Sequence, residues 1–281
     1  EVSKVDTTAA ASGGFGDCWK GLFLGQHQIA MKCSRSHIAP EIAMRVRLAE
    51  REMKVWKSLQ HPNILPFIGP VILETPVKAL YMVSPWMENS DLGKYINANP
   101  NADCLRLLTQ IATGLEYLHT SGVIHGDLKA ANILISGTGD ARIADFGLSE
   151  MTTEVDENTQ GCSSAWKHGG NPRWQAPELF ENYKRTKASD IFAFGRVIYE
   201  AYTRDVPFAG FPRLRIYAIV DRGELPPRPS GKSSEPGGFN DDMWQFMARC
   251  CETKPQQRPD AHEVVAYLLS ISKTPDRACS P

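Results

Sequence analysis

The sequence has no long hydrophobic run and no strong excess of charge of either sign. None of the apolar stretches in its 281 residues approaches the roughly 20 residues that a membrane-spanning helix needs, and no signal peptide is recognisable at its start. The 31 basic and 32 acidic residues give a formal net charge of −1. Proteins that bind nucleic acids or membrane surfaces usually carry a lopsided balance, so we expect neither kind of contact from this domain.

The seven cysteines lack paired spacing. Their number is odd, and the adjacent pair Cys250-Cys251 does not match a metal-binding pattern. We therefore expect reduced thiols in a protein of the cytoplasm or the nucleus.

Apolar residues make up 42% of the sequence, which is enough for a substantial core. The length suits one large domain or two lobes that share a cleft. Residues 1–35 alternate, are punctuated by glycine and end in a strand pattern over residues 28–32. Helical spacing over residues 40–60 stops before Pro62, and a further strand is predicted over residues 79–83. The first part of the chain is thus predicted to be rich in strands.

The rest of the chain is predicted to be mainly helical. Residues 105–119 form a clear amphipathic pattern, and residues 124–146 predict two short strands around a turn. Residues 147–172 are polar and lack periodicity, and a loop of this length inside a compact domain is usually functional. Further helices are expected near residues 177–182, 189–203, 241–252 and 260–272.

A glycine-rich turn precedes the lysine that ends the first strand-rich segment. Gly13, Gly14 and Gly16 lie between two strand patterns, and Lys32 lies on the next strand. Glycines let a backbone turn its N–H groups toward phosphates, and a lysine adds a point charge. Alone, the same pattern is more often an ordinary hairpin turn.

The segment His125-Gly126-Asp127-Leu128-Lys129-Ala130-Ala131-Asn132 is far more specific. It places a carboxylate, an ammonium and an amide in one short loop, a set that can accept a hydroxyl proton, neutralise a phosphoryl group and help to hold a metal ion. Asp145-Phe146-Gly147 adds a second carboxylate suited to Mg²⁺, which prefers oxygen ligands. The order of these elements, rather than any one of them, decides the interpretation.

With these motifs in this order, the chain resembles the eukaryotic protein kinases over essentially its whole length. The resemblance implies an α+β, bilobal fold. Its N-lobe, residues 1–84, would hold a five-stranded antiparallel sheet and one regulatory helix, and its larger C-lobe, residues 85–275, would be mainly helical. It also implies ATP and Mg²⁺ as cofactors, a protein substrate, and a monomer by default.

The resemblance assigns a role to each polar group of these motifs. Lys32 would bind the α- and β-phosphates, and Glu52 of the regulatory helix would pair with it. Asp127 would be the catalytic base and Lys129 would balance the charge of the transferred phosphoryl group. Asn132 and Asp145 would hold Mg²⁺. Structural roles are implied for three further residues: an ion pair of Glu178 with Arg258, and Asp190 as a brace for the catalytic loop.

The adenine site follows from the same resemblance. Ser84 would be the gatekeeper, and the backbone of Met87 would meet the adenine ring. Cys18, Ala30 and Leu134 would enclose the ring from both sides. Without the resemblance, this apolar trio would be an equally good fit to plain core.

Finer features suggest a group within the family. Lys129 is typical of serine/threonine enzymes, which favours them over tyrosine kinases. Ala130-Ala131-Asn132, Pro172-Arg173-Trp174, Cys250 and Arg258-Pro259 are similar to the tyrosine-kinase-like group, and the catalytic loop is similar to that of kinases expanded in mushroom-forming fungi.

Three departures from the family pattern affect the prediction. Ala11 replaces the first glycine of the phosphate loop, which we expect to weaken ATP binding. Asn171 replaces a threonine beside the base, which leaves substrate preference open, although it could still bond to Asp127. Gly126 replaces an arginine that reads a phosphate on the activation segment, and Arg173 could offer a substitute charge. An active kinase is the favoured prediction, with a pseudokinase scaffold and a small-molecule phosphotransferase as alternatives.

Overall fold

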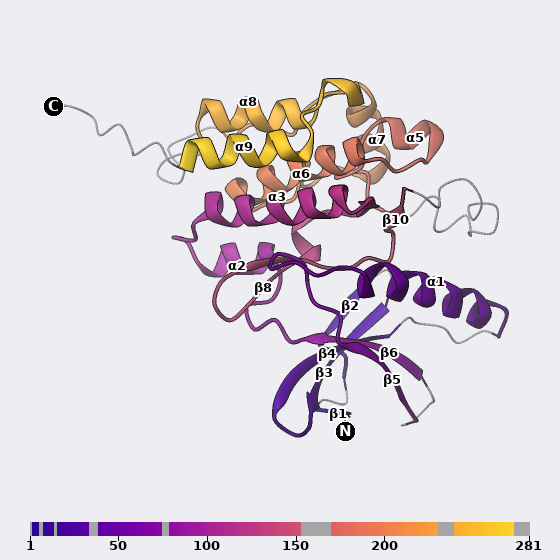
Figure 1. Cartoon of the computed structure of the whole chain (residues 1–281). Helices are drawn as coiled ribbons and strands as arrows, with labels where there is room; N and C mark the ends of the chain where they lie inside the picture. Colours follow the sequence, from indigo (N-terminus) through magenta and orange to yellow (C-terminus); the bar gives the residue numbers. More distant parts are fainter. Residues whose placement is uncertain are drawn as a thin grey trace.

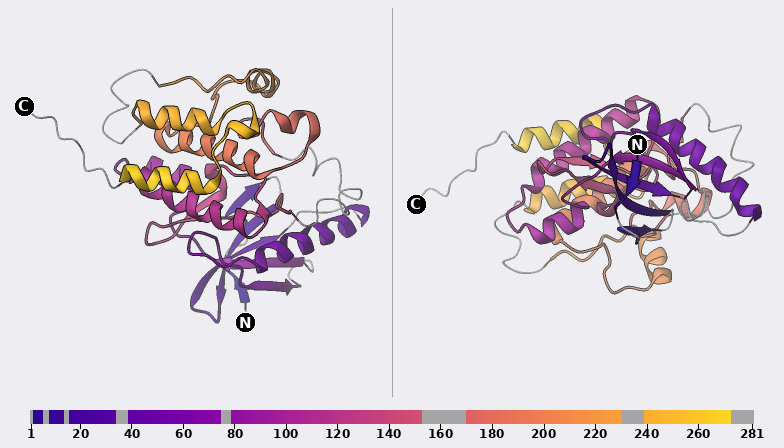
Figure 2. Two further views of the ribbon diagram at one scale, coloured as in Figure 1. Left: turned by 45° about the horizontal axis from the view of Figure 1, so that its top comes forward. Right: turned by 90° about the horizontal axis from the view of Figure 1, so that it is seen from below.

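The computed structural model describes residues 2–5, 8–13, 16–33, 39–74, 79–152, 170–229 and 239–272. Within them, a sheet with one long helix lies against a larger, mainly helical part (Figure 1). The predicted α+β, bilobal fold is therefore confirmed. Figure 2 shows that the long helix α1 and the pair α8 and α9 lie at opposite ends of the molecule.

The sheet of the N-lobe is antiparallel throughout. Its order is β1-β3-β4-β6-β5, and β2 also pairs with β3. Strands β1 and β2 both pair with β3 and together occupy one position beside it. The six strands therefore fill the five positions that were predicted. The bounds are β1 Val2–Lys4, β2 Ala11–Gly13, β3 Gly16–Phe23, β4 His27–Cys33, β5 Gly69–Leu73 and β6 Ala79–Pro85.

The two faces of this sheet have different uses. Alternation along β4 sends Ile29 and Met31 to one face, where they are buried with Tyr81 and Val83 in a small apolar cluster. The opposite face carries Lys32 and Ala30 of the same strand. Cys18 and Met82 lie beside Lys32 on the neighbouring strands, and Ser84 lies beside Ala30. The alternation of β4 thus places the lysine on the face away from that cluster.

Helix α1, Ala39–Lys57, carries Glu52 toward the sheet. Glu52 is buried, as are Val55 and Trp56 one turn later. The Trp56 indole donates a hydrogen bond to the carbonyl of Leu65 at 2.6 Å, and its ring lies 5.9 Å from that of Phe146. The contact with Phe146 joins the end of the helix to the C-lobe.

The C-lobe is built around α6, Lys187–Thr203, in which every residue from Ser189 to Ala201 is buried. Its start is fixed by a capping box in which Thr186 and Ser189 bond to each other's backbone. The other elements are α2 Leu92–Ala98, α3 Cys104–Thr120, β7 Val123–Ile124, η1 Ala130–Asn132, β8 Ile133–Ile135, β9 Ala141–Ile143, β10 Glu150–Met151, α5 Glu178–Asn182, α7 Arg213–Asp221, α8 Asp241–Cys250, η4 Pro255–Gln257 and α9 Ala261–Ser272.

The amphipathic helix predicted over residues 105–119 is α3, and the predicted strands around the turn are β8 and β9, which pair with each other. The apolar stripe of α3 is buried as predicted, with Leu107, Leu108, Ile111, Leu115 and Leu118 all in the main core. In the described ranges no helix is both long and apolar enough to cross a membrane.

Candidate active site

The loop between β7 and β8 is held by Asp190 of α6. The Asp190 carboxylate accepts the backbone N–H groups of His125 at 2.8 Å and Gly126 at 2.9 Å, and it lies 3.0 Å from the His119 ring. Burial opposes its charge, but these interactions lower the pKa of Asp190 overall, with His119 as the main cause. The predicted brace is confirmed.

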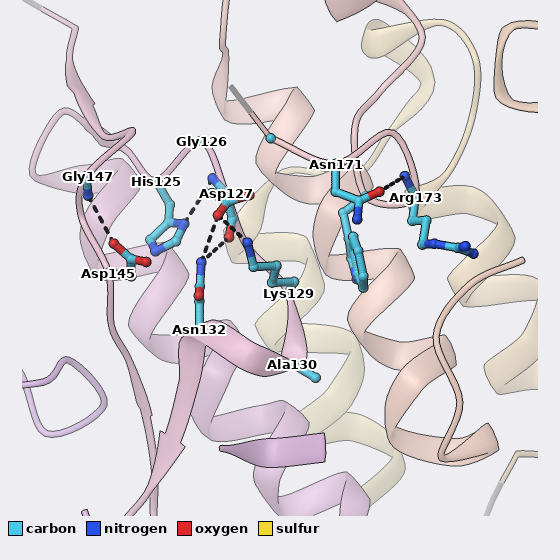
Figure 3. A network of polar contacts seen from close by, with 12 residues as sticks. His125, Gly126, Asp127, Lys129, Ala130, Asn132, Asp145, Gly147, Asn171 and Arg173 are labelled. Atoms are coloured by element: carbon cyan, nitrogen blue, oxygen red, sulfur yellow. Dashed lines mark hydrogen bonds and ion pairs between the residues drawn. The ribbon is translucent and has the colours of Figure 1, made fainter. Parts of the chain in front are cut away.

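Three predicted residues of this loop meet around one carboxylate (Figure 3). The Lys129 ammonium lies 2.5 Å from Oδ2 of Asp127. The Asn132 amide donates to the same oxygen at 3.0 Å and to the Asp127 carbonyl at 2.8 Å. The short helix η1 brings Asn132 back over the loop, which is why residues five positions apart can touch. Asp127 is 8% exposed, so its free oxygen faces a restricted space.

Lys32 joins the two lobes. Its ammonium lies 2.7 Å from Oε1 of Glu52 and 2.6 Å from Oδ1 of Asp145. Burial disfavours the ammonium, but the two carboxylates outweigh it and raise the pKa of Lys32. Burial likewise opposes the charge of Asp145, yet Lys32 holds the pKa of that carboxyl below its ordinary value. This three-residue contact keeps one positive and two negative charges together where β4, α1 and the segment after β9 meet.

Asp145 has an unusual backbone. Its φ is 66°, in the left-handed region that residues other than glycine rarely adopt. Its Oδ1 also accepts the N–H of Gly147 at 3.4 Å. Such a conformation persists only where surrounding contacts enforce it, and it turns the carboxylate toward Lys32.

The residues present suit a magnesium ion bound with a nucleotide. Mg²⁺ is usually held by one or two carboxylates together with substrate phosphates rather than by an all-protein cage. Asp145 supplies a carboxylate, and the Asn132 amide nitrogen is used by Asp127, which leaves its carbonyl oxygen as an acceptor. Among the described residues, no group of three or more histidine, cysteine, aspartate or glutamate side chains could hold a metal by itself.

The predicted adenine residues come from both lobes. Ala30 pairs with Ser84, and Cys18 pairs with Lys32. Met87 lies just after β6 and is buried, and Leu134 of β8 packs on the main core while part of its surface stays accessible.

The glycine-rich turn is a β hairpin. Ala11 pairs with Cys18 and Gly13 pairs with Gly16, while Gly14 lies outside the described residues. Because Ala11 is in an extended strand, which any residue adopts, the backbone freedom of glycine is not needed at that position.

Glu200 of α6 is a site residue that the sequence interpretation missed. It accepts the backbone N–H of Ala130 at 2.9 Å and the indole N–H of Trp174 at 2.7 Å, and so joins the loop between β7 and β8 to the segment near Asn171. Burial raises the pKa of Glu200 to about 7. The available signal was a carboxylate within residues 197–202, a stretch of α6 that is otherwise apolar or aromatic.

Asn171 and Arg173 make other contacts than those predicted for them. Asn171 accepts the backbone N–H of Arg173 at 3.2 Å, and in the described part of the chain no hydrogen bond joins it to Asp127. The Arg173 guanidinium donates to the carbonyls of Pro207, Phe208 and Phe211. The Arg173 guanidinium thus binds the segment 207–211 and does not supply the positive charge that is missing at Gly126.

The predicted pair of Glu178 and Arg258 is present. Both distances of a two-point contact are 2.7 Å, and the arginine side chain is fully buried. The pair fastens the start of α5 to the chain after η4.

Comparison with known proteins now identifies the family. The family model "Protein tyrosine and serine/threonine kinase" matches residues 7–268. The chain belongs to the protein kinase family. This kinase domain is 31% identical over 266 residues to "Serine/threonine/tyrosine-protein kinase HT1" of Arabidopsis thaliana. The matched residues make up 92% of this chain and 64% of that protein. It is 30% identical over 263 residues to "MAP3K epsilon protein kinase 1" of the same plant, covering 91% of this chain and 18% of that protein.

A slime-mould relative shows the same pattern. "Probable serine/threonine-protein kinase drkB" of Dictyostelium discoideum is 28% identical over 266 residues, which is 92% of this chain and 36% of that protein. The kinase domain therefore spans less than two thirds of the length of these relatives.

Proposed function

We propose that this kinase domain transfers the γ-phosphoryl group of ATP to hydroxyl groups of protein substrates, with serine and threonine preferred over tyrosine. The observation that carries the proposal is the contact of Lys32 with both Glu52 and Asp145. A kinase site needs a lysine–glutamate pair and a metal-binding aspartate in place together, and the contact supports assigning these roles to Lys32, Glu52 and Asp145.

Asp127 is proposed as the catalytic base. Its carboxylate lies on the braced loop, with one oxygen held by Asn132 and Lys129 and the other able to accept a hydroxyl proton. Lys129 places a positive charge at the same point, where it can balance the phosphoryl group in transit. Phosphoryl transfer depends mainly on positioning and charge, which these contacts supply.

The cofactor would be MgATP, which supplies the transferred group and neutralises part of its charge. We propose that Lys32 binds its phosphates and that Asn132 and Asp145 hold the metal. The β2–β3 hairpin would cover the phosphates, with Cys18, Ala30, Ser84, Met87 and Leu134 around the adenine. The domain would work as one unit, with residues 1–84 on one side of the nucleotide and residues 85–275 on the other.

The preference for serine and threonine is supported by Lys129 and by relatives such as drkB, a probable serine/threonine-protein kinase. The name of the HT1 relative includes tyrosine as well and does not favour either acceptor. We further propose membership of the tyrosine-kinase-like group, on Ala130-Ala131-Asn132 and Pro172-Arg173-Trp174. A pseudokinase remains the alternative. It gains little from Ala11, which lies in an extended strand.

The test is transfer of radiolabelled phosphate from ATP to a degenerate peptide library whose acceptor is serine, threonine or tyrosine. We expect label in the serine and threonine sets. Binding of MgATP without label in any set would favour the pseudokinase. Label that passes only to small-molecule hydroxyl acceptors would favour the small-molecule phosphotransferase.

A further inference from the structure

The catalytic loop has an arginine beside it that comes from another element. Gly126 has a φ of 80°, and a Cβ at that position would lie 2.5 Å from Cδ of Arg185 and 2.7 Å from the Leu148 carbonyl oxygen. Arg185 lies in the connection between α5 and α6, and only 3% of its surface is exposed. The space next to Gly126 is therefore filled by the stem of Arg185.

Arg185 contacts the peptide group that carries Asp127. Its Nε donates to the Gly126 carbonyl at 3.3 Å. That carbonyl belongs to the peptide bond between Gly126 and Asp127, while the N–H of Gly126 is held by Asp190. Arg185 and Asp190 thus fix Gly126 from its two sides, immediately before the proposed base.

Arg185 forms an ion pair with Glu150. The distance from Nη1 to Oε1 is 3.4 Å, and the two side chains are only 2% and 6% exposed. Glu150 lies in β10, where it pairs with Ile124 just before the catalytic loop. The pair therefore joins the segment after Asp145 to that loop.

A second arginine acts on the same carboxylate. Burial raises the pKa of Glu150, and the positive charges of Arg185 and Arg51 oppose that rise. Arg51 is the neighbour of Glu52 on α1. The charge of Glu150 is thus influenced from the helix that carries Glu52 as well as from Arg185.

We propose that Arg185 is a positioning residue for phosphoryl transfer and that Glu150 is its built-in anion, so that the catalytic loop is aligned without a phosphate on the activation segment. The proposal rests on the kinase function proposed above. A buried ion pair gives little net stability compared with apolar side chains. A contribution to stability alone therefore does not explain why Arg185 and Glu150 are paired at this position. The bond of Arg185 to the Gly126 carbonyl gives it a direct effect on the base.

Four variants test the proposal, with phosphatase-treated protein whose loss of phosphate is verified by intact mass. Arg185→Met should lower kcat at least tenfold and leave the KM for ATP within about twofold, because Lys32 and Asp145 are untouched. Arg185→Lys, which keeps the charge, should recover part of the loss. Arg222→Met is the matched control, since it removes the arginine of an exposed pair with Glu224 and should change neither parameter.

The double variant Arg185→Met/Glu150→Gln separates positioning from stability. Arg185→Met alone leaves a buried carboxylate with one fewer positive charge and should lower the Tm. Removing both charges should restore much of the Tm while kcat stays low, because the bond to Gly126 is still missing. A purely structural role requires kcat to recover with the Tm.

Each failure has its own signature. If treated wild type transfers phosphate but the double variant keeps kcat within twofold of it, the proposal is wrong. The same holds if phosphatase lowers the wild-type kcat about a hundredfold and rephosphorylation restores it. If wild type binds MgATP but transfers nothing in either form, the kinase function itself fails, and this proposal with it.

Discussion

The Lys32 ammonium lies 2.7 Å from the Glu52 carboxylate, which joins strand β4 to helix α1. The glutamate is 6% exposed, so little solvent competes for either charge. This contact orients the lysine toward Asp145 and the proposed phosphate site, and the first prediction follows from it.

Replacing Glu52 should weaken the use of ATP. Glu52→Gln leaves Lys32 without one of its two carboxylate partners, so we expect kcat/KM for ATP to fall by ten- to a hundredfold, about 1.4 to 2.7 kcal/mol. Steady-state kinetics at varied ATP measure this. Glu50→Gln, at an exposed position on the same helix, is the control and should behave as wild type. An equal effect of both variants would mean that the charge pair has no specific role.

Glu200 should make stability depend on pH. Its pKa is raised from 4.5 to about 7 by burial, so the folded protein disfavours the ionised form. The wild type therefore loses stability as the pH rises from about 4.5 to about 7 and loses no more above that range. Glu200→Gln removes this titration and keeps an oxygen for the Ala130 N–H.

We expect the free energy of unfolding of Glu200→Gln, relative to wild type, to increase by roughly 3 kcal/mol between pH 4.5 and pH 8. Urea unfolding of both proteins at the two pH values gives this difference. Glu224→Gln, on an exposed residue, should show no such trend. A constant difference between Glu200→Gln and wild type would mean that Glu200 titrates at its ordinary pKa.

Arg258 should be among the most costly residues to replace outside the site. Besides its two bonds to Glu178, it donates to the carbonyls of Ala188, Glu252 and Thr253. Arg258→Met leaves the Glu178 carboxylate and these carbonyls without a donor, so we expect a loss of about 3 to 5 kcal/mol in unfolding free energy. Arg222→Met should cost less than about 0.5 kcal/mol. Similar losses in both would show that the buried network contributes nothing special.

Sequence pattern predicted the long helices well but missed two of the shorter ones. Helix α3 was expected over residues 105–119 and spans Cys104–Thr120, because a sustained apolar stripe identifies both helix and buried face. Helices α2 and α7 were missed. They have seven and nine residues, too few turns for a periodic pattern to stand out.

Contacts of the site were predicted where the family motifs name both partners, even when these are far apart, as for Glu178 and Arg258, and were missed where they do not. Asp127, Lys129 and Asn132 lie within one short loop, so their order in the sequence was enough. Arg185 is 59 residues from Gly126, and no local pattern connects them. Only the folded chain shows that the side chain missing at Gly126 is replaced from the α5–α6 connection.

Asp145 should control nucleotide binding through the metal. Asp145→Asn removes one negative charge from the proposed magnesium site, so we expect the affinity for ATP to fall at least tenfold with Mg²⁺ present and to change little in EDTA. Isothermal titration calorimetry under both conditions gives the comparison. Asp221→Asn, at the exposed end of α7, is the control. An equal loss with and without Mg²⁺ would assign Asp145 a role that does not involve the metal.

The most direct test of the account is the turnover of Asp127→Asn, measured as transfer of labelled γ-phosphate alongside the dissociation constant of MgATP. Asparagine keeps the size of the side chain and removes its ability to take a proton. We predict that kcat falls at least a hundredfold, while the dissociation constant stays within about threefold because Lys32 and Asp145 are unchanged. A variant that retains full turnover would contradict it.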